Sequence, residues 1–137
     1  MIKLRWIPTL LWVCSMAAIL AFGSEGGKLF RSSGIPASWR EVAHVLGFAG
    51  LGALAALSLA GPRLRTAAIA IVVCLAFAVL DEWHQGFIPW RGRSLSDVGF
   101  DLVGIALGVL LVSLSRSRRA EARVRVPSEG ESSSILL

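Results

Sequence analysis

Charged residues are scarce in this sequence. Asp, Glu, Lys and Arg make up 17% of its 137 residues, whereas hydrophobic residues make up 55%. An average soluble domain carries about 25% charged residues and has fewer uninterrupted apolar runs. This shortage of charge argues against a soluble globular domain and favours a protein with several membrane-spanning segments. The length allows one small helical bundle.

Cysteine and histidine are also rare. Cys14 and Cys74 both lie inside apolar runs without a CxxC spacing, so buried thiols are favoured over a disulfide or a metal pair. There are two histidines and no HExxH pattern, so no metal and no other cofactor is predicted. The net charge of +5 does not indicate nucleic-acid binding, because the basic residues form short clusters beside apolar segments.

Four apolar segments each approach the roughly 20 residues that a helix needs to cross a hydrocarbon core about 30 Å thick. They cover residues 6–22, 39–60, 66–85 and 97–114. A sheet is disfavoured, because the segments lack period-2 alternation and a bilayer accepts only helices or closed barrels. The predicted fold is all-α, a polytopic membrane bundle of four transmembrane helices within residues 1–115. Residues 116–137 are predicted to form a disordered tail, basic at first and then rich in Ser and Glu.

Turn and capping residues separate these segments. Residues 23–35 are rich in Gly and Ser, which predicts a loop. Ser38 with Glu41, and Ser94 with Asp97, have the spacing of capping boxes at the starts of the second and fourth helices. The first segment leaves two interpretations open, a helical anchor or a cleaved signal peptide, because a basic N-terminus precedes it.

The distribution of Lys and Arg predicts the orientation. Nine of these 14 residues lie in the N-terminus, in the loop between the second and third segments, or in the tail; the other five lie in the two remaining loops. The positive-inside rule then places both termini in the cytoplasm. His44, residues 81–93 and Asp97 would share the outer face. The basic run at 116–125 is expected to contact anionic lipid of the inner leaflet.

The end of the third segment carries several ionisable groups. A charge at the centre of a membrane helix costs roughly 3 kcal/mol, so ionisable groups in such a segment suggest a functional site. On a helical wheel, four polar side chains share an arc of about 160° and are expected to face the bundle: Asp81, Glu82, His84 and Gln85. Trp83 points the opposite way. A solvated helix end is the alternative interpretation.

The loop that follows adds Arg91 and Arg93, which are expected either to neutralise these carboxylates or to bind a phosphate or carboxylate group. Phe87 and Trp90 are interpreted as interfacial anchors or as an aromatic wall for an amphiphilic ligand. The candidate ligand-binding residues are therefore Asp81, Glu82, Gln85, Phe87, Trp90, Arg91 and Arg93.

One face of the fourth segment combines acidic residues with glycines that allow close helix approach, all within about 60° on the wheel: Asp97, Asp101, Gly104 and Gly108. Asp101 needs a proton, an arginine or a histidine as its partner. His44 is either a packing residue or such a partner. Small residues near it are expected to permit close packing: Ala43, Gly47 and Gly50.

Two blocks carry a resemblance to a known family: His44-x-x-x-Phe48-x-x-Leu51, and Asp81-Glu82-x-x-Gln85-x-Phe87-x-Pro89-x-Arg91 followed by Asp97, Gly104 and Gly108. This pattern resembles that of the VanZ-like family. The resemblance implies a small multi-pass protein of the bacterial cytoplasmic membrane, in a family named after an accessory factor for teicoplanin resistance and without an established biochemical activity. The chain departs from the pattern at Asp101, where the family usually carries asparagine, and at Glu41, where it often carries lysine.

Three functions fit these residues. The leading hypothesis is an envelope protein whose outer-facing polar pocket binds an amphiphilic molecule or a lipid-linked cell-wall precursor. The alternative is a membrane enzyme that acts on a phosphate- or sugar-bearing envelope lipid by acid–base chemistry, with candidate catalytic residues His44, Glu82, Asp97 and Asp101. The third is a structural or assembly role. Membrane lipids are expected partners, and the oligomeric state is left open.

Overall fold

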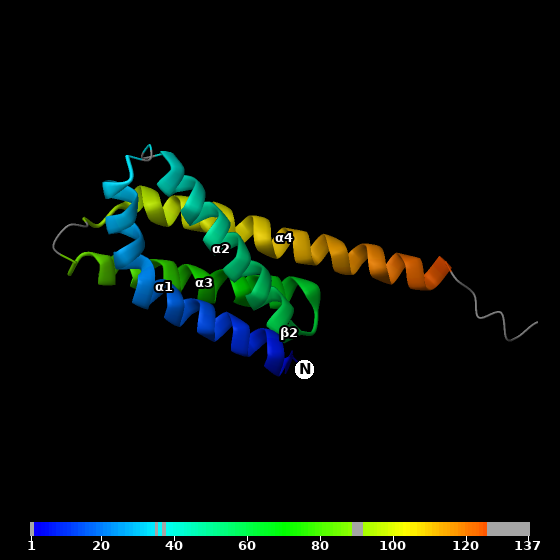
Figure 1. The fold of residues 1–137 in the computed structure, drawn as a ribbon. Coiled ribbons are helices and arrows are strands. Elements are labelled where there is room, and N and C mark those ends of the chain that lie inside the picture. Colours follow the sequence, from blue (N-terminus) through cyan, green and yellow to red (C-terminus); the bar gives the residue numbers. More distant parts are fainter. Residues whose placement is uncertain (1, 35, 37, 89–91, 126–137) are drawn as a thin grey trace, which may run out of the picture.

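The computed structural model describes residues 2–34, 36, 38–88 and 92–125. The elements follow in the order β1 (Lys3–Leu4), α1 (Trp6–Ser32), α2 (Ser38–Ser58), β2 (Leu59–Ala60), α3 (Arg63–Gln85) and α4 (Leu95–Arg125). Within the described part of the chain, all four helices are long and apolar enough to cross a membrane (Figure 1). The predicted all-α bundle of four transmembrane helices is therefore confirmed.

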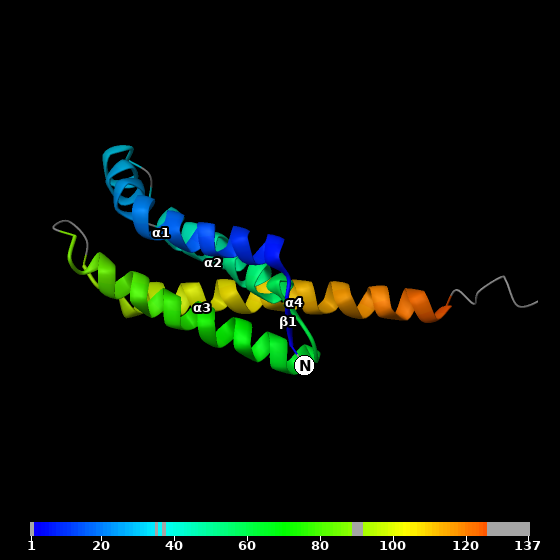
Figure 2. The same ribbon diagram turned by 90° about the horizontal axis from the view of Figure 1, so that it is seen from below.

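Both described ends of the chain lie at the same end of the bundle. The N-terminal segment, the connection between α2 and α3, and the C-terminal half of α4 gather there, whereas α1 and α3 end, and α2 and α4 begin, at the opposite end (Figures 1 and 2). This arrangement follows from an even number of crossings. That this end faces the cytoplasm stays a prediction, based on its arginines and lysines.

Two helices extend further than the sequence indicated. α1 continues to Ser32, through part of the expected loop at 23–35, and α4 continues to Arg125, where disorder was expected from residue 116. Proline is absent from both extensions, and glycine inside a helix costs only about 1 kcal/mol. Arginine and alanine, which favour helix, dominate the extension of α4. Residues 126–137 of the predicted tail lie outside the described residues.

A two-residue antiparallel ladder joins β1 to β2, with Lys3 opposite Ala60 and Leu4 opposite Leu59. The sequence did not indicate this pairing, which lies at a bundle end where extended backbone can be tolerated. The backbone N–H of Arg5 also donates to the carbonyl oxygen of Ser58 at 2.7 Å. The sequence left two interpretations of the first segment open, a helical anchor or a signal peptide. In the structure this segment is a helix, and a backbone hydrogen bond joins the residue before it to the end of α2.

Alanines and larger aliphatic side chains share the interior of the bundle. The buried core includes Ala55, Ala78, Leu51 and Ile105, together with the thiol of Cys74. Cys14 is a free cysteine on the exposed side of α1, so the expectation that both thiols are buried is wrong for Cys14. Exposed leucine and valine side chains cover the outer faces of the helices, as expected for surfaces that contact lipid.

The closest helix contact is between α2 and α4, along the glycine face predicted for the fourth helix. A Cβ atom on Gly104 would meet the carbonyl oxygen of Val45, and one on Gly108 would meet that of Ala49. From the other side, a Cβ on Gly52 would lie 2.6 Å from the carbonyl oxygen of Ile105. Backbone therefore touches backbone, which only residues without a side chain allow.

Arg116 of α4 completes the end of α2. Its Nη2 atom donates to the carbonyl oxygens of Ala56 at 2.8 Å and Leu59 at 3.2 Å. The carbonyl of Ala56 belongs to the last turn of α2, where it lacks a partner along the helix and the helix dipole favours a cation, and Leu59 is the first residue after the helix. Arg116 thus joins α4 to the C-terminal end of α2.

We expect Gly108→Ala to destabilise the bundle, because the added methyl group overlaps the backbone of Ala49 and overpacking costs about 1–3 kcal/mol. Gly47→Ala is the matched control, since a Cβ there has no neighbour within 4 Å. Thermal unfolding in detergent should show a lower midpoint for Gly108→Ala and an unchanged or higher one for Gly47→Ala. Equal midpoints for both variants would contradict the close α2–α4 contact.

Candidate functional site

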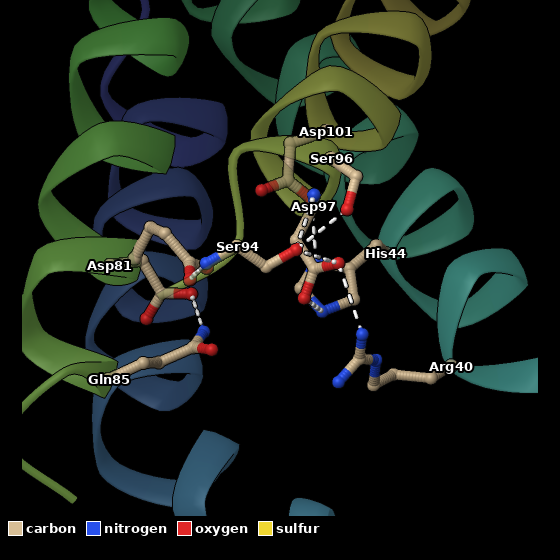
Figure 3. Close-up of polar contacts among 9 residues, drawn as sticks. Arg40, His44, Asp81, Gln85, Ser94, Ser96, Asp97 and Asp101 are labelled. Carbon is tan, nitrogen blue, oxygen red and sulfur yellow. Dashed lines mark hydrogen bonds and ion pairs between the residues drawn. The ribbon is translucent and has the colours of Figure 1, made fainter. Parts of the chain in front are cut away.

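Polar side chains from α2, α3 and the start of α4 meet at the end of the bundle away from the termini (Figure 3). We call these residues the polar cluster: Arg40, His44, Asp81, Glu82, Gln85, Ser94, Asp97 and Asp101. All four of its carboxylates are buried, with no more than 6% of each residue exposed. Three separate helices thus bring together groups that are far apart in the sequence.

His44 of α2 lies between the two aspartates of α4. Its Nδ1 atom is 2.8 Å from Oδ1 of Asp101, and its Nε2 atom is 3.8 Å from Oδ2 of Asp97. Arg40, one turn earlier on α2, places Nη2 at 3.3 Å from Oδ1 of Asp97. The ring of His44 also stacks in parallel on Phe48, at 6.4 Å between centroids. Asp101 therefore has the histidine partner that the sequence required.

The capping box at the start of α4 is modified. The N–H of Asp97 donates to Oγ of Ser94 at 3.3 Å, and that hydroxyl donates to Oδ1 of Asp97 at 2.9 Å. In the usual box, the third residue of the helix would also accept the N–H of the capping residue. Here the N–H of Ser94 donates to Oε1 of Glu82 from α3. Glu82 thereby joins α3 to α4, and the carboxylate of Asp97 is available to Arg40 and His44.

Asp81 and Gln85 form a pair one turn apart on α3. Nε2 of Gln85 donates to Oδ2 of Asp81 at 2.7 Å, and each residue is 3% exposed. Oε1 of Gln85 and Oε2 of Glu82 are buried, and neither has a hydrogen-bond partner among the residues that the structure describes. A buried acceptor without a donor costs about 1–3 kcal/mol. These two atoms are therefore the places where the cluster can accept hydrogen bonds from another molecule.

An exposed aromatic surface lies beside the cluster, at the end of α3. The rings of Trp83 and Phe87 meet edge to face at 4.8 Å between centroids. Arg93 packs its side chain against Gly86, and its Cζ atom lies 5.9 Å from the centre of the Phe87 ring. This surface combines apolar area with a cation. Trp90 and Arg91, two other predicted ligand residues, lie outside the described residues.

Several sequence-based expectations for this region are wrong. His84 is exposed and does not turn into the bundle with its neighbours. Gly47 and Gly50 have no neighbour that a Cβ would meet, and Ala43 is exposed, so they do not pack around His44. Arg40 was not among the candidate site residues. Its spacing of four from His44 was the available signal, because residues four apart share a helix face.

The donor atoms of the cluster suit hydrogen bonding and proton transfer. Among the described residues, no group of three or more His, Cys, Asp or Glu side chains could hold a metal ion. A carboxylate that holds Nδ1 of an imidazole orients the ring and supports a proton on the other nitrogen. The arrangement of Asp101, His44 and Asp97 can therefore bind a polar group or exchange a proton with it.

The contact between His44 and Asp101 should contribute to stability, because Asp101 is buried, His44 is partly buried, and each would otherwise lose a partner. We expect His44→Leu and Asp101→Ala each to lower the free energy of unfolding, by about 1–3 kcal/mol. The double variant should lose less free energy of unfolding than the two single variants lose together, and the difference, the coupling energy, should be about 0.5–3 kcal/mol. Denaturant titrations in detergent micelles measure all four proteins; strictly additive losses would contradict the contact.

Comparison with known proteins gave one match. A family model described as VanZ/LLP1 matches residues 4–116, from β1 through most of α4. Neither the curated proteins nor the solved structures gave a significant match. The matched range contains every residue of the polar cluster.

Proposed function

The chain belongs to the VanZ/LLP1 family, and we propose that it binds the polar head of an amphiphilic molecule at the polar cluster. The four membrane-spanning helices make it a multi-pass membrane protein. We place it in the bacterial cytoplasmic membrane, with the polar cluster at the outer rim. Its occupant would be a lipid-linked cell-wall intermediate or a similar envelope amphiphile.

The two buried acceptors carry this proposal. Oε2 of Glu82 and Oε1 of Gln85 lack donors within the described part of the chain, although a buried acceptor without a donor is destabilising. A helix contact that only joined α3 to α4 would need Oε1 of Glu82 alone. Hydroxyl or amino groups of a ligand head are donors of the required kind.

The surroundings favour an amphiphile over a fully water-soluble ligand. Trp83 and Phe87 expose 53% and 64% of their area beside the cluster, where an apolar tail could lie at the membrane interface. The guanidinium of Arg93 can pair with an anionic group such as a phosphate. A sugar–phosphate head on a lipid tail offers hydroxyl donors, negative charge and apolar area together. Retention of such a molecule would connect the protein to glycopeptide resistance of the teicoplanin type.

Glu82→Gln tests this proposal without changing the shape of the side chain. The amide oxygen keeps the hydrogen bond from Ser94, whereas the amide nitrogen replaces the open acceptor by a donor. We expect this variant to weaken binding of a donor-bearing head about tenfold, the effect of one lost charge-assisted hydrogen bond. The measurement is crosslinking of a fluorescent polyprenyl-diphosphate-linked sugar by a photoreactive phenylalanine at position 87, titrated against probe concentration.

Glu41→Gln is the matched control, because Glu41 is an exposed glutamate near the same end of α2. It should crosslink as the unmodified protein does. Equal labelling of the Glu82→Gln protein, at an unchanged melting temperature, would remove the binding proposal and leave a structural role for the cluster.

The contact between His44 and Asp101 favours a second function, a membrane enzyme acting on the same lipid class. Asp101 would hold Nδ1 of the imidazole, and Nε2 would take the proton of an attacking water or hydroxyl. As the attacking oxygen bonds to the phosphorus or the anomeric carbon, the bond to the leaving oxygen breaks. Asp97, 3.8 Å from Nε2, or Glu82 would give the leaving oxygen a proton and be reprotonated from Nε2.

His44→Gln separates the enzyme from the binding protein. If the protein is an enzyme, mass spectrometry of envelope lipids incubated with it should show a product, formed about 10²–10⁴-fold more slowly by the variant. Crosslinking of the probe should persist, because the open acceptors are on α3. Absence of any product with the unmodified protein would sink the enzyme hypothesis and leave the binding function intact.

A further inference from the structure

A groove with basic and apolar walls lies at the end of the bundle opposite the polar cluster. Its volume is about 820 Å³, within the range of about 300–1,000 Å³ that is usual for sites of small ligands. The walls come from three parts of the chain and include Arg5, Leu57 of α2, and Leu111, Arg116, Arg119 and Ala120 of α4. Neither the polar cluster nor its proposed function involves these residues.

The positive charge of the groove has no acidic counterpart among the described residues that line it. None of the residues lining it is Asp or Glu. Arg5 and Arg63 both act electrostatically on Arg116, and the side chain of Arg63 reaches the backbone carbonyl of Arg116 at 3.3 Å. Like charges gathered in this way are unfavourable unless an anion joins them, since the repulsion is stronger beside an apolar wall than in water.

Arg116 retains donors for such an anion. Only its Nη2 atom bonds to the end of α2, and a guanidinium carries five N–H groups. Arg119, three residues later on the same helix, is exposed, and its side chain makes no hydrogen bond or ion pair within the described ranges. Two guanidinium groups one turn apart can therefore face one phosphate.

The position of the groove along α4 matches that of a membrane interface. Asp97 and Arg116 are separated along α4 by 19 residues, or about 28 Å, which is close to the thickness of the hydrocarbon core. With the polar cluster at one interface, Arg116 lies at the other. Leu57 and Leu111 then lie inside the bilayer, on the side from which a lipid chain can enter.

We propose that this groove binds one anionic phospholipid from the bilayer, with its phosphate against Arg116 and Arg119 and an acyl chain along Leu57 and Leu111. Basic pockets between membrane helices bind anionic headgroups on the cytoplasmic side in this way. The apolar half of the groove favours a lipid over a free anion, because a soluble phosphate would leave that wall exposed. The bound lipid would join the N-terminal segment, α2 and α4 at the end stabilised by Arg116.

Native mass spectrometry of the full chain in detergent tests the proposal. Phosphatidylglycerol and phosphatidylcholine with the same acyl chains are added in turn, and the fraction carrying one lipid is measured against lipid concentration. We expect one phosphatidylglycerol to bind at least tenfold more tightly than phosphatidylcholine. Arg119→Gln should weaken phosphatidylglycerol about tenfold. The matched control is Arg118→Gln, an exposed neighbour that does not line the groove and should change nothing.

Arg119 is chosen over Arg116 because loss of Arg116 would also remove the partner of the backbone carbonyls of Ala56 and Leu59. Equal binding of both lipids, or an equal loss with Arg118→Gln and Arg119→Gln, would overturn the proposal in favour of a general basic surface. Full displacement of the lipid by millimolar inorganic phosphate would overturn it in favour of a soluble anion. None of these outcomes bears on crosslinking at the polar cluster.

Discussion

α2 and α4 run parallel, and their backbones touch where Gly104 and Gly108 face Val45 and Ala49. Two side-chain contacts of this pair share a separation of 57 residues: Arg40 with Asp97, and His44 with Asp101. An equal separation one turn apart is what two parallel helices in close contact produce. The glycine contact therefore sets the register that brings imidazole to carboxylate at one end of the pair, and the guanidinium of Arg116 to backbone carbonyls at the other.

Burying carboxylates inside a bilayer is energetically unfavourable, and contacts between the helices of the bundle offset this penalty. Asp97 and Asp101 share the α4 face that carries the glycines, so they must face α2, which supplies Arg40 and His44. Glu82 receives the N–H of Ser94 and brings α3 into the same network. In the described part of the chain, two acceptors on α3 remain without donors after these contacts are made, and the proposed ligand site rests on them.

The two ends of the α2–α4 pair have opposite electrostatic character. Buried carboxylates dominate at the end where α2 and α4 begin, whereas arginines without acidic neighbours in the groove gather where α2 ends. One parallel helix pair thus presents an acceptor-rich site at one membrane interface and a basic groove at the other. We propose a ligand head that donates hydrogen bonds for the first, and an anionic lipid headgroup for the second.

The positions of the four helices, the cap at Ser94 and the face shared by Asp101 and Gly104 could all be predicted from the sequence. Each follows from local spacing, because hydrophobic length, capping residues and the 3.6-residue period act within one helix. Tertiary structure decided that Gly52 rather than Gly47 meets α4, and that Glu82 accepts the N–H of Ser94. Periodicity defines which residues share a face, but only packing determines how each face is rotated and aligned against its neighbours.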